Sequence, residues 1–236
     1  MPALDKDFIQ RLADRGSAHP RFKWYITAII ALAALNYPEE IGPLYTRLLE
    51  TYIAPEDHVE QTRKIKEALV KAAGLHGAAK TGNAMRALYQ VTPAHLVDST
   101  CYRESDLDPE AAYKRGDEFL KSIYRDVPDI NTEDDYVRKC SPDYFFLVSR
   151  LLYPHIFSYT GILDKLESSQ AIISSLIAID CTGQARNHMK GMLWNGASRE
   201  EVTMVRDIVA LIAERLGVRF KGGKGVIDVP ELPDPN

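Results

Sequence analysis

The sequence predicts an all-α protein, a bundle built of helical hairpins. Apolar residues recur at three- and four-residue spacings in one segment after another, whereas the alternation typical of strands is nearly absent. Residues that start or stop helices, such as Asn36, Pro38 and Gly217, separate these segments. Ser198 and Glu201 have the spacing of a capping box, in which two side chains satisfy free amides at a helix start.

Helices are expected along both halves of the chain. In the first half, the punctuation predicts helices over 2–15, 21–35, 38–52, 55–74 and 78–90. In the second half, it predicts helices over 109–124, 142–158, 163–180, 184–193 and 198–217. Pro154 interrupts the apolar and aromatic segment 142–158, and 127–132 is expected to be a loop. Residues 221–236 are rich in Gly and Pro and predict a tail or a docked arm.

Composition and charge exclude several classes of protein. With 45% apolar and 26% charged residues among 236, the chain can bury a large core and is too apolar for a disordered protein. The net charge of −4, without a block of Lys and Arg, argues against a nucleic-acid partner. The longest apolar run, 26–35, has about half the length that a bilayer requires, so we expect a buried helix and no membrane span.

The two ends of the chain predict no targeting signal. Residues 1–16 contain three acidic side chains that argue against a transit peptide, and no apolar segment for secretion is present. The terminal Asp234-Pro235-Asn236 is not a peroxisomal address. We therefore expect a soluble intracellular protein, cytoplasmic in the first instance, with an organelle left open. The apolar helices exceed what one thin layer buries, so we also expect a homo-oligomer.

The three cysteines, Cys101, Cys140 and Cys181, lie far apart in the sequence. No C-x-x-C pair exists, so neither a zinc ribbon nor a dithiol redox motif is available. An odd number of cysteines in an intracellular chain favours free thiols. No group of His, Asp and Glu has the spacing of metal ligands, so we expect neither a metal nor another cofactor.

An offset of 143 residues aligns 29–75 with 172–218 without gaps and gives seven identities. Helix starts and stops also coincide, because Pro55 falls on Ser198 and Gly74 falls on Gly217. Two diverged copies of one helical unit would explain this match, and so would features that all helices share. We divide the chain into a first helical half, 1–100, as a degenerate repeat, a second half, 101–220, and the tail, 221–236.

The densest polar cluster of the sequence runs from Asp180 to His188. On a helix, Cys181, Gln184 and His188 fall at positions i, i+3 and i+7, which places a thiol, an amide and an imidazole on one face. The imidazole is the one group of the three that can transfer protons near neutral pH without a perturbed pKa. A pocket for a small polar ligand is one interpretation, and a partly buried histidine that caps a backbone carbonyl is the other.

A long motif spans the same region. Residues 161–165 read GILDK, and 25 residues after Leu163 the segment 188–202 reads HMKGMLWNGASREEV. This motif resembles the carboxymuconolactone decarboxylase pattern, in which GLD leads without gaps to H-x-R-x-A-L-x-N-G-A-T-R-E-E. Residues 108–161 and the first-half segment 73–88 are also similar to that family. The resemblance implies an all-α fold of helical hairpins, in which the repeat would be an alkylhydroperoxidase-like unit, and obligate oligomers.

The resemblance implies one of two activities, decarboxylation of a small lactone acid or, in the alkylhydroperoxidase branch, thiol-dependent reduction of peroxides. The second branch uses Glu…C-x-x-C-x-x-x-His, and this chain has Ser169 at the Glu and Gln184 at the second Cys. A two-thiol relay is therefore excluded, which leaves a one-Cys mechanism. In the decarboxylase branch, His155 replaces a carboxylate and Ser168 replaces an Arg. Without that Arg a substrate carboxylate loses a bidentate partner, so we expect a different small molecule.

The predicted site centres on His188 as general acid or base, with Cys181 as the second catalytic candidate. The candidates for substrate binding come from both halves of the chain and are Gln184, His155, Asn195, Asn83 and His76. We expect one composite pocket per chain, between 78–83 and the His188 segment, since Tyr45 replaces His188 at the offset of 143. The leading function is acid/base chemistry on a small organic acid or lactone. A one-Cys hydroperoxide reductase is the alternative enzyme, and a non-catalytic scaffold or ligand-binding protein is the third hypothesis.

Overall fold

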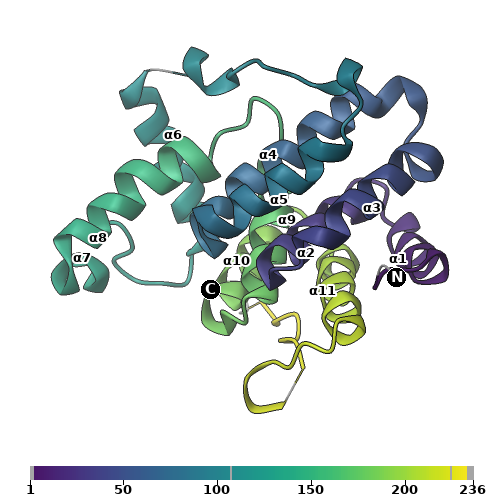
Figure 1. Ribbon diagram of the computed structural model, residues 1–236. Helices are drawn as coiled ribbons and strands as arrows, with labels where there is room; N and C mark the ends of the chain where they lie inside the picture. Colours follow the sequence, from purple (N-terminus) through teal and green to yellow (C-terminus); the bar gives the residue numbers. More distant parts are fainter. Residues whose placement is uncertain (1–2, 107, 224, 233–236) are drawn as a thin grey trace.

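The computed structural model describes residues 3–106, 108–223 and 225–232, and these residues form the predicted all-α fold (Figure 1). The first half contains α1 (Lys6–Ser17), α2 (Trp24–Leu35), η1 (Pro38–Glu40), α3 (Ile41–Arg47), η2 (Leu48–Tyr52), η3 (Pro55–Asp57), α4 (His58–His76), α5 (Ala78–Val91) and η4 (Ala94–Leu96). The second half contains η5 (Tyr102–Ser105), α6 (Pro109–Ile123), α7 (Tyr136–Cys140), α8 (Pro142–Phe146), η6 (Leu147–Phe157), α9 (Lys165–Ala178), α10 (Thr182–Trp194), α11 (Arg199–Arg215) and η7 (Lys221–Gly223). Within the same ranges, no helix combines the length and the apolarity needed to cross a membrane.

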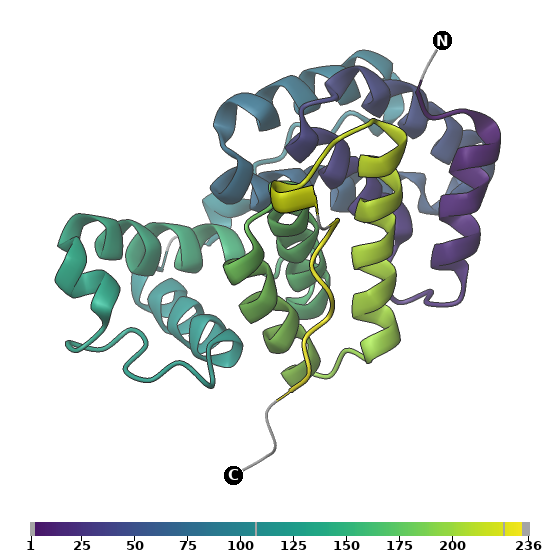
Figure 2. The same cartoon turned by 90° about the horizontal axis from the view of Figure 1, so that it is seen from below.

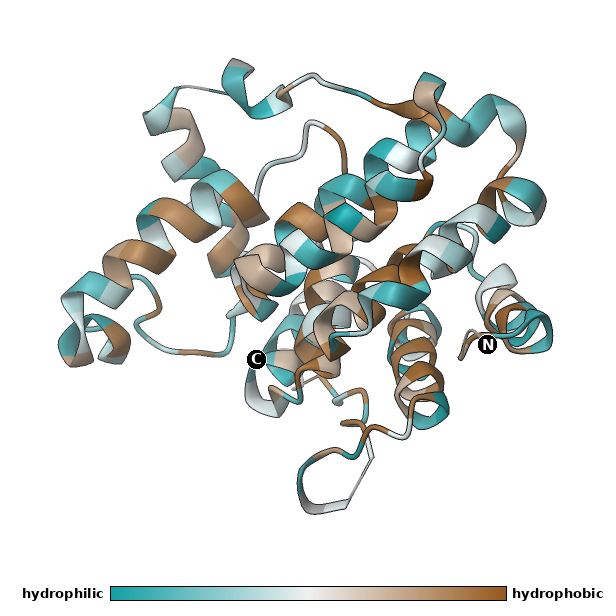
Figure 3. Cartoon of the chain, in the orientation of Figure 1, coloured by the Kyte–Doolittle hydropathy of each residue, from teal (hydrophilic) through white to brown (hydrophobic). Residues whose placement is uncertain are grey.

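Two buried helices, α2 and α9, form the centre of the molecule. They pack against each other, and each also packs against α4 and α11. Buried residues make up 11 of the 12 positions in α2 and 13 of the 14 in α9. α2 has almost no polar residues and therefore has to lie inside, whereas α9 also buries serines and Gln170, which form hydrogen bonds there. Figure 3 shows the hydropathy of these helices. The run 26–35 is therefore a buried helix, as predicted.

Several helix ends lie at the residues that the sequence marks. Asn36 follows α2 in the left-handed conformation, with a φ of 69°, and Gly217 follows α11 with a φ of 68°. Ser198 and Glu201 form both hydrogen bonds of a capping box at the start of α11. These residues satisfy orphan backbone groups locally, which is why the sequence predicts these helix ends well.

The arrangement of the central helices bears on the predicted repeat. At the offset of 143, α2 corresponds to α9 and α4 corresponds to α11, and both α2 and α9 lie between α4 and α11. Tyr45, the counterpart of His188, is fully buried, and its hydroxyl lies 2.6 Å from Thr62 Oγ1. The arrangement is compatible with two copies of one unit, and the repeat itself stays a prediction.

A lobe formed by α6, α7, α8 and η6 lies beside the central helices (Figure 2). In this lobe α8 continues directly into η6, an 11-residue π-helix that contains Pro154. The predicted interruption at Pro154 therefore takes the form of wider helical turns. Next to it, α6 comes so close to η6 that a Cβ on Gly116 would lie 2.8 Å from the Pro154 nitrogen. Only glycine allows this approach.

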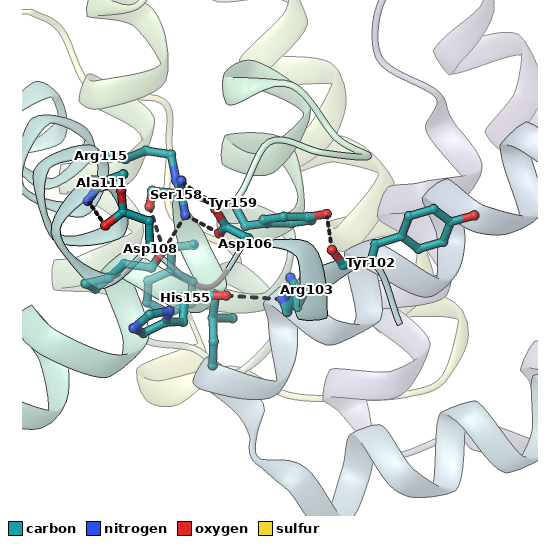
Figure 4. A network of polar contacts seen from close by, with 12 residues as sticks. Tyr102, Arg103, Asp106, Asp108, Ala111, Arg115, His155, Ser158 and Tyr159 are labelled. Carbon is teal, nitrogen blue, oxygen red and sulfur yellow. Dashed lines mark hydrogen bonds and ion pairs between the residues drawn. The ribbon is translucent and has the colours of Figure 1, made fainter. Parts of the chain in front are cut away.

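Three cations hold the carboxyl end of η6, and Figure 4 shows two of them, Arg103 and Arg115. Lys71 Nζ donates to the carbonyl oxygens of residues 156, 157 and 159 at 2.6–3.2 Å. Arg103 and Arg115 donate to the carbonyl oxygens of residues 155 and 154, each at 3.1 Å. Glu67 pairs with Arg103 and Lys71, and Asp106 pairs with Arg115. Positive charge at a helix carboxyl end satisfies free carbonyls, so this network fixes the position of η6.

The segment after α11 docks along that helix as an arm. Arg206 donates to the carbonyl oxygens of residues 226 and 227, and Arg199 donates to those of 229 and 230. Val226 and Val229 are buried. The tail is thus a docked arm as far as residue 232, while the terminal tripeptide 234–236 lies outside the described residues.

Candidate functional site

A cavity of about 180 Å³ lies where α10 meets the lobe. Residues from the end of α4, from α6, α7, α8, η6, α9 and α10, and from the loop between α6 and α7 surround it. Most are apolar or aromatic, and they are Gly74, Leu75, Leu120, Tyr124, Ile130, Asn131, Asp135, Tyr136, Val137, Tyr144, Phe145, Val148, Ser149, Leu152, Tyr153, Phe157, Leu176, Gln184 and His188. Of the three residues predicted to share one helix face, Gln184 and His188 therefore line the cavity and Cys181 does not.

The fold brings His188 and two tyrosines together from three elements. Gln184 and His188 lie one turn apart on α10, Tyr124 directly follows α6, and Tyr153 belongs to η6. At Gly191, α10 approaches α6 closely, since a Cβ there would lie 2.8 Å from an α-carbon at the end of α6. This close packing places the His188 ring edge-to-face with Tyr124, with the ring centroids 5.7 Å apart.

The hydrogen bonds of the site define the state of the imidazole. The Tyr124 hydroxyl donates to Gln184 Oε1 at 2.5 Å and lies 3.3 Å from His188 Nε2. The Tyr153 hydroxyl lies 3.5 Å from the same nitrogen. Because Tyr124 gives its proton to Gln184, its oxygen can only accept from His188, which places the ring proton on Nε2. The buried Nδ1 atom is then a free acceptor, with no hydrogen-bond partner among the described residues.

Burial keeps the reactive groups of the site uncharged. His188 is 4% exposed, and desolvation lowers its pKa to about 3, so the ring is neutral at pH 7. Desolvation also raises the pKa of Tyr124 to about 12 and the pKa of Tyr153 well above its usual value. A neutral imidazole thus faces two protonated phenols, an arrangement suited to proton transfer and to hydrogen bonding of an oxygen.

Cys181 and His76 lie near the cavity but do not line it. Cys181 is half-buried at the amino end of α10, one position outside the helix. His76 ends α4, and its two ring nitrogens lie 3.0 Å from Ser175 Oγ and Thr81 Oγ1. Burial, with a smaller contribution from Lys80, lowers the pKa of His76 to about 4. Both ring nitrogens of His76 thus have partners within the protein.

The other predicted residues lie away from the cavity. The Asn195 side chain donates to Ser122 and to the Gly191 carbonyl and accepts from Lys165, so it joins the end of α10 to α6 and α9. Asn83 is exposed on α5. His155 packs edge-on against the ring of Tyr113.

The sequence predicts a composite pocket between 78–83 and the His188 segment, and the cavity beside His188 is not built in this way. Of the described residues, none in 78–83 lines the cavity, and the first half contributes only Gly74 and Leu75 at the end of α4. The prediction placed α5 opposite His188. In the structure the lobe forms that wall instead, since η6 packs against both α4 and α6.

Sequence reasoning missed Tyr124, Tyr153 and Asp135. The first two lie 64 and 35 residues from His188, and neither belongs to the motif around it. The aromatic density of 142–158 was a signal for this wall of the cavity, but it does not say which face of η6 turns toward α10. Within the described ranges, no group of three or more His, Cys, Asp and Glu side chains could hold a metal ion.

Comparison with known proteins finds two relatives whose printed names state no activity. No family model matches the chain. The chain is 29% identical over 198 residues to Peroxisomal protein 2 of Schizosaccharomyces pombe, which covers 84% of this chain and 89% of the relative. It is 25% identical over 274 residues to Peroxisomal protein 2 of Saccharomyces cerevisiae, which covers 91% of this chain and 96% of the relative. The chain is thus similar, over most of its length, to two yeast proteins whose shared name gives an organelle.

Proposed function

We propose that the protein is a carboxymuconolactone decarboxylase-like enzyme that performs acid/base chemistry on a small lactone or organic acid at His188. One observation supports this proposal above others. The buried, neutral imidazole of His188 lies in the wall of a cavity large enough for a small molecule. Its Nε2 atom lies 3.3 and 3.5 Å from two tyrosine hydroxyls, and its Nδ1 atom has no partner among the described residues. The motif that contains His188 supports the same family.

The chemistry follows from the protonation states. The free nitrogen of His188 can take a proton from a carbon next to a carbonyl group, and the electron pair of the broken C–H bond moves onto the carbonyl oxygen. A tyrosine hydroxyl that remains protonated can donate a hydrogen bond to the oxygen as negative charge develops there. The proton then returns from the imidazolium to the product. The pKa shifts keep both groups uncharged on the free enzyme, and the burial that lowers the pKa of His188 also makes its ring a weaker base.

Two variants test this proposal against the one-Cys hydroperoxide reductase. The purified protein is incubated with a panel of small lactones and keto acids, and the products are followed by mass spectrometry. We expect His188→Asn to lower kcat/KM by about 100- to 10,000-fold, because it removes the base and keeps a polar group of similar size. We expect Cys181→Ser to change it by less than about threefold, because Cys181 lies outside the cavity.

The opposite pattern would favour the alternatives. If the protein reduces an organic hydroperoxide with an added thiol, and Cys181→Ser abolishes that activity, the reductase hypothesis replaces the proposal. If His188→Asn turns over the panel as fast as the unmodified protein, His188 is not the base. If the unmodified protein and His188→Asn both lack activity but still bind small molecules, the ligand-binding hypothesis is correct.

We also propose that the protein resides in peroxisomes, on the basis of the name that its two relatives share. Fluorescent fusions at either end, imaged with a peroxisomal marker, test this proposal. At least one fusion should coincide with the marker, and diffuse fluorescence from both would contradict it.

A further inference from the structure

Among the described residues that line the cavity, Asp135 alone carries a formal charge. This carboxylate is 4% exposed and accepts hydrogen bonds from the backbone amides of Asn131 and Val137, each at 2.8 Å. No Lys or Arg occurs among the described residues that line the cavity. An anionic ligand would therefore meet a buried negative charge and no counter-ion, at a high cost in desolvation.

Three lysines on helices that contribute to the cavity wall, α4, α9 and α10, have partners of their own. Lys190 on α10 pairs with Asp126, and Lys165 donates to Asn195 at 2.9 Å. Lys71 holds the carboxyl end of η6. Since each of these three lysines already has partners, moving one of them beside a bound carboxylate would break those contacts.

The cavity nevertheless offers hydrogen bonds to an uncharged oxygen. The proton of Tyr124 is committed to Gln184, whereas the Tyr153 hydroxyl lies at a long 3.5 Å from His188 Nε2 and also interacts with the Tyr124 hydroxyl. Two buried polar atoms of lining residues, Ser149 Oγ and His188 Nδ1, have no hydrogen-bond partner among the described residues. Unpaired buried polar atoms are rare in folded proteins. The Ser149 hydroxyl can donate a hydrogen bond to a carbonyl oxygen, whereas an unprotonated ring nitrogen cannot.

Volume limits the ligand to about one ring. An apolar cavity of about 150 Å³ binds benzene. The cavity of about 180 Å³ thus has room for a six-membered ring with a small substituent.

We infer that the cavity binds an uncharged carbonyl compound of single-ring size, such as a lactone or an aromatic ketone, and excludes the corresponding carboxylate. Tyr153 donates to the carbonyl oxygen, and Asp135 sets the selectivity against anions. This inference rests on the proposed function. It narrows the substrate class from lactones and organic acids to uncharged lactones and ketones, in which a proton is transferred from the carbon next to the carbonyl group. Its binding preference can be measured without turnover.

Acetophenone and benzoate are suitable probes because they share a ring and differ in charge. Their dissociation constants for the full chain are measured at pH 7 by ligand-observed NMR. We expect acetophenone to bind at least about tenfold more tightly than benzoate. Tyr153→Phe should weaken acetophenone binding by about five- to tenfold, because it removes one hydrogen bond and little volume. Tyr52→Phe is the matched control, since Tyr52 donates to Gln10 outside the cavity.

Asp135→Asn tests the charge selectivity separately, because asparagine keeps the size of the side chain and one acceptor oxygen that can still cap α7 at the Val137 amide, while the hydrogen bond from the Asn131 amide is lost. We expect it to tighten benzoate binding by at least about threefold and to leave acetophenone binding unchanged. Thermal unfolding shows whether each variant is folded, and if Tyr153→Phe is not, Asp135→Asn still provides the test.

Benzoate binding as tight as acetophenone binding would overturn the inference, as would the absence of acetophenone binding at millimolar concentration. Unchanged acetophenone binding in folded Tyr153→Phe would overturn it as well. If only the proposed function is wrong, the protein still prefers acetophenone to benzoate, but His188→Asn does not lower kcat/KM.

Discussion

At the scale of residues, the half-buried His76 and the buried His188 differ in how their ring nitrogens are paired. Desolvation lowers the pKa of both His76 and His188, to about 4 and about 3. Both nitrogens of His76 have hydroxyl partners within the protein, whereas His188 keeps one nitrogen without a partner among the described residues. Of these two histidines, His188 lines the cavity and His76 does not, which is why the proposed chemistry is placed at His188.

The low pKa of His188 predicts a specific dependence of stability on pH. The unfolded chain binds a proton at this histidine below about pH 6.5, and the folded chain binds it only near pH 3. Between these values the unfolded state holds more protons, so stability falls as the pH falls, by about 1.4 kcal/mol per pH unit for a fully buried group.

Urea denaturation of the unmodified protein and of His188→Asn measures this contribution. Between pH 6.5 and 4.5, we expect the unmodified protein to lose about 2 kcal/mol more than the variant. Equal losses in the two proteins would mean that His188 has an ordinary pKa in the folded state. His76 titrates in both proteins and cancels in the comparison.

At the scale of elements, η6 was the hardest part of the site to predict. The sequence predicts one interrupted helix over 142–158, and the structure has one, formed by α8 and η6. The π-type turns depend on Pro154, on the close approach of α6, and on Lys71, Arg103 and Arg115, which come from three distant parts of the chain. Local patterns contain no information about such long-range partners, so neither η6 nor the orientation of Tyr153 could be predicted.

Gly116 gives a test of the packing between α6 and η6. A Cβ at this position would lie 2.8 Å from backbone atoms of Pro154, which cannot move like a flexible side chain. We expect Gly116→Ala to lower the free energy of unfolding by about 1–3 kcal/mol, although alanine favours a helix.

Gly82 on α5 is the matched control, because a Cβ there meets nothing within 4 Å. We expect Gly82→Ala to raise the free energy of unfolding by up to about 1 kcal/mol. Urea denaturation measures both variants, and a Gly116→Ala protein as stable as Gly82→Ala would show that α6 and η6 do not meet this closely.

At the scale of the whole molecule, local signals predicted the architecture and only part of the site. Helix ends such as Asn36, Gly217 and the capping box at Ser198 lie within a few residues of the groups that they satisfy, so the sequence shows them. Gln184 and His188 were found for the same reason, because they are neighbours on one helix. Tyr124 and Tyr153 come from the packing of the lobe against α10 and were not predictable from one sequence.

The exposed apolar side chains of the lobe relate to the predicted homo-oligomer. Tyr144, Phe146, Leu147 and Leu151 of α8 and η6 are between 41% and 57% exposed. Tyr144 also lines the cavity, so one surface adjoins both the solvent and the site. The homo-oligomer stays a prediction, and its interface would have to leave the cavity open to a ligand.

The central claim is that His188 is a buried, neutral base beside a ligand cavity, and an NMR titration of its imidazole tests this claim most directly. Ring signals assigned with the help of His188→Asn are followed from pH 8 down to pH 5. We expect the His188 signals to show a neutral ring with its proton on Nε2 over this whole range and to shift when acetophenone is added. A transition near pH 6.5, or signals that acetophenone leaves unchanged, would contradict the claim.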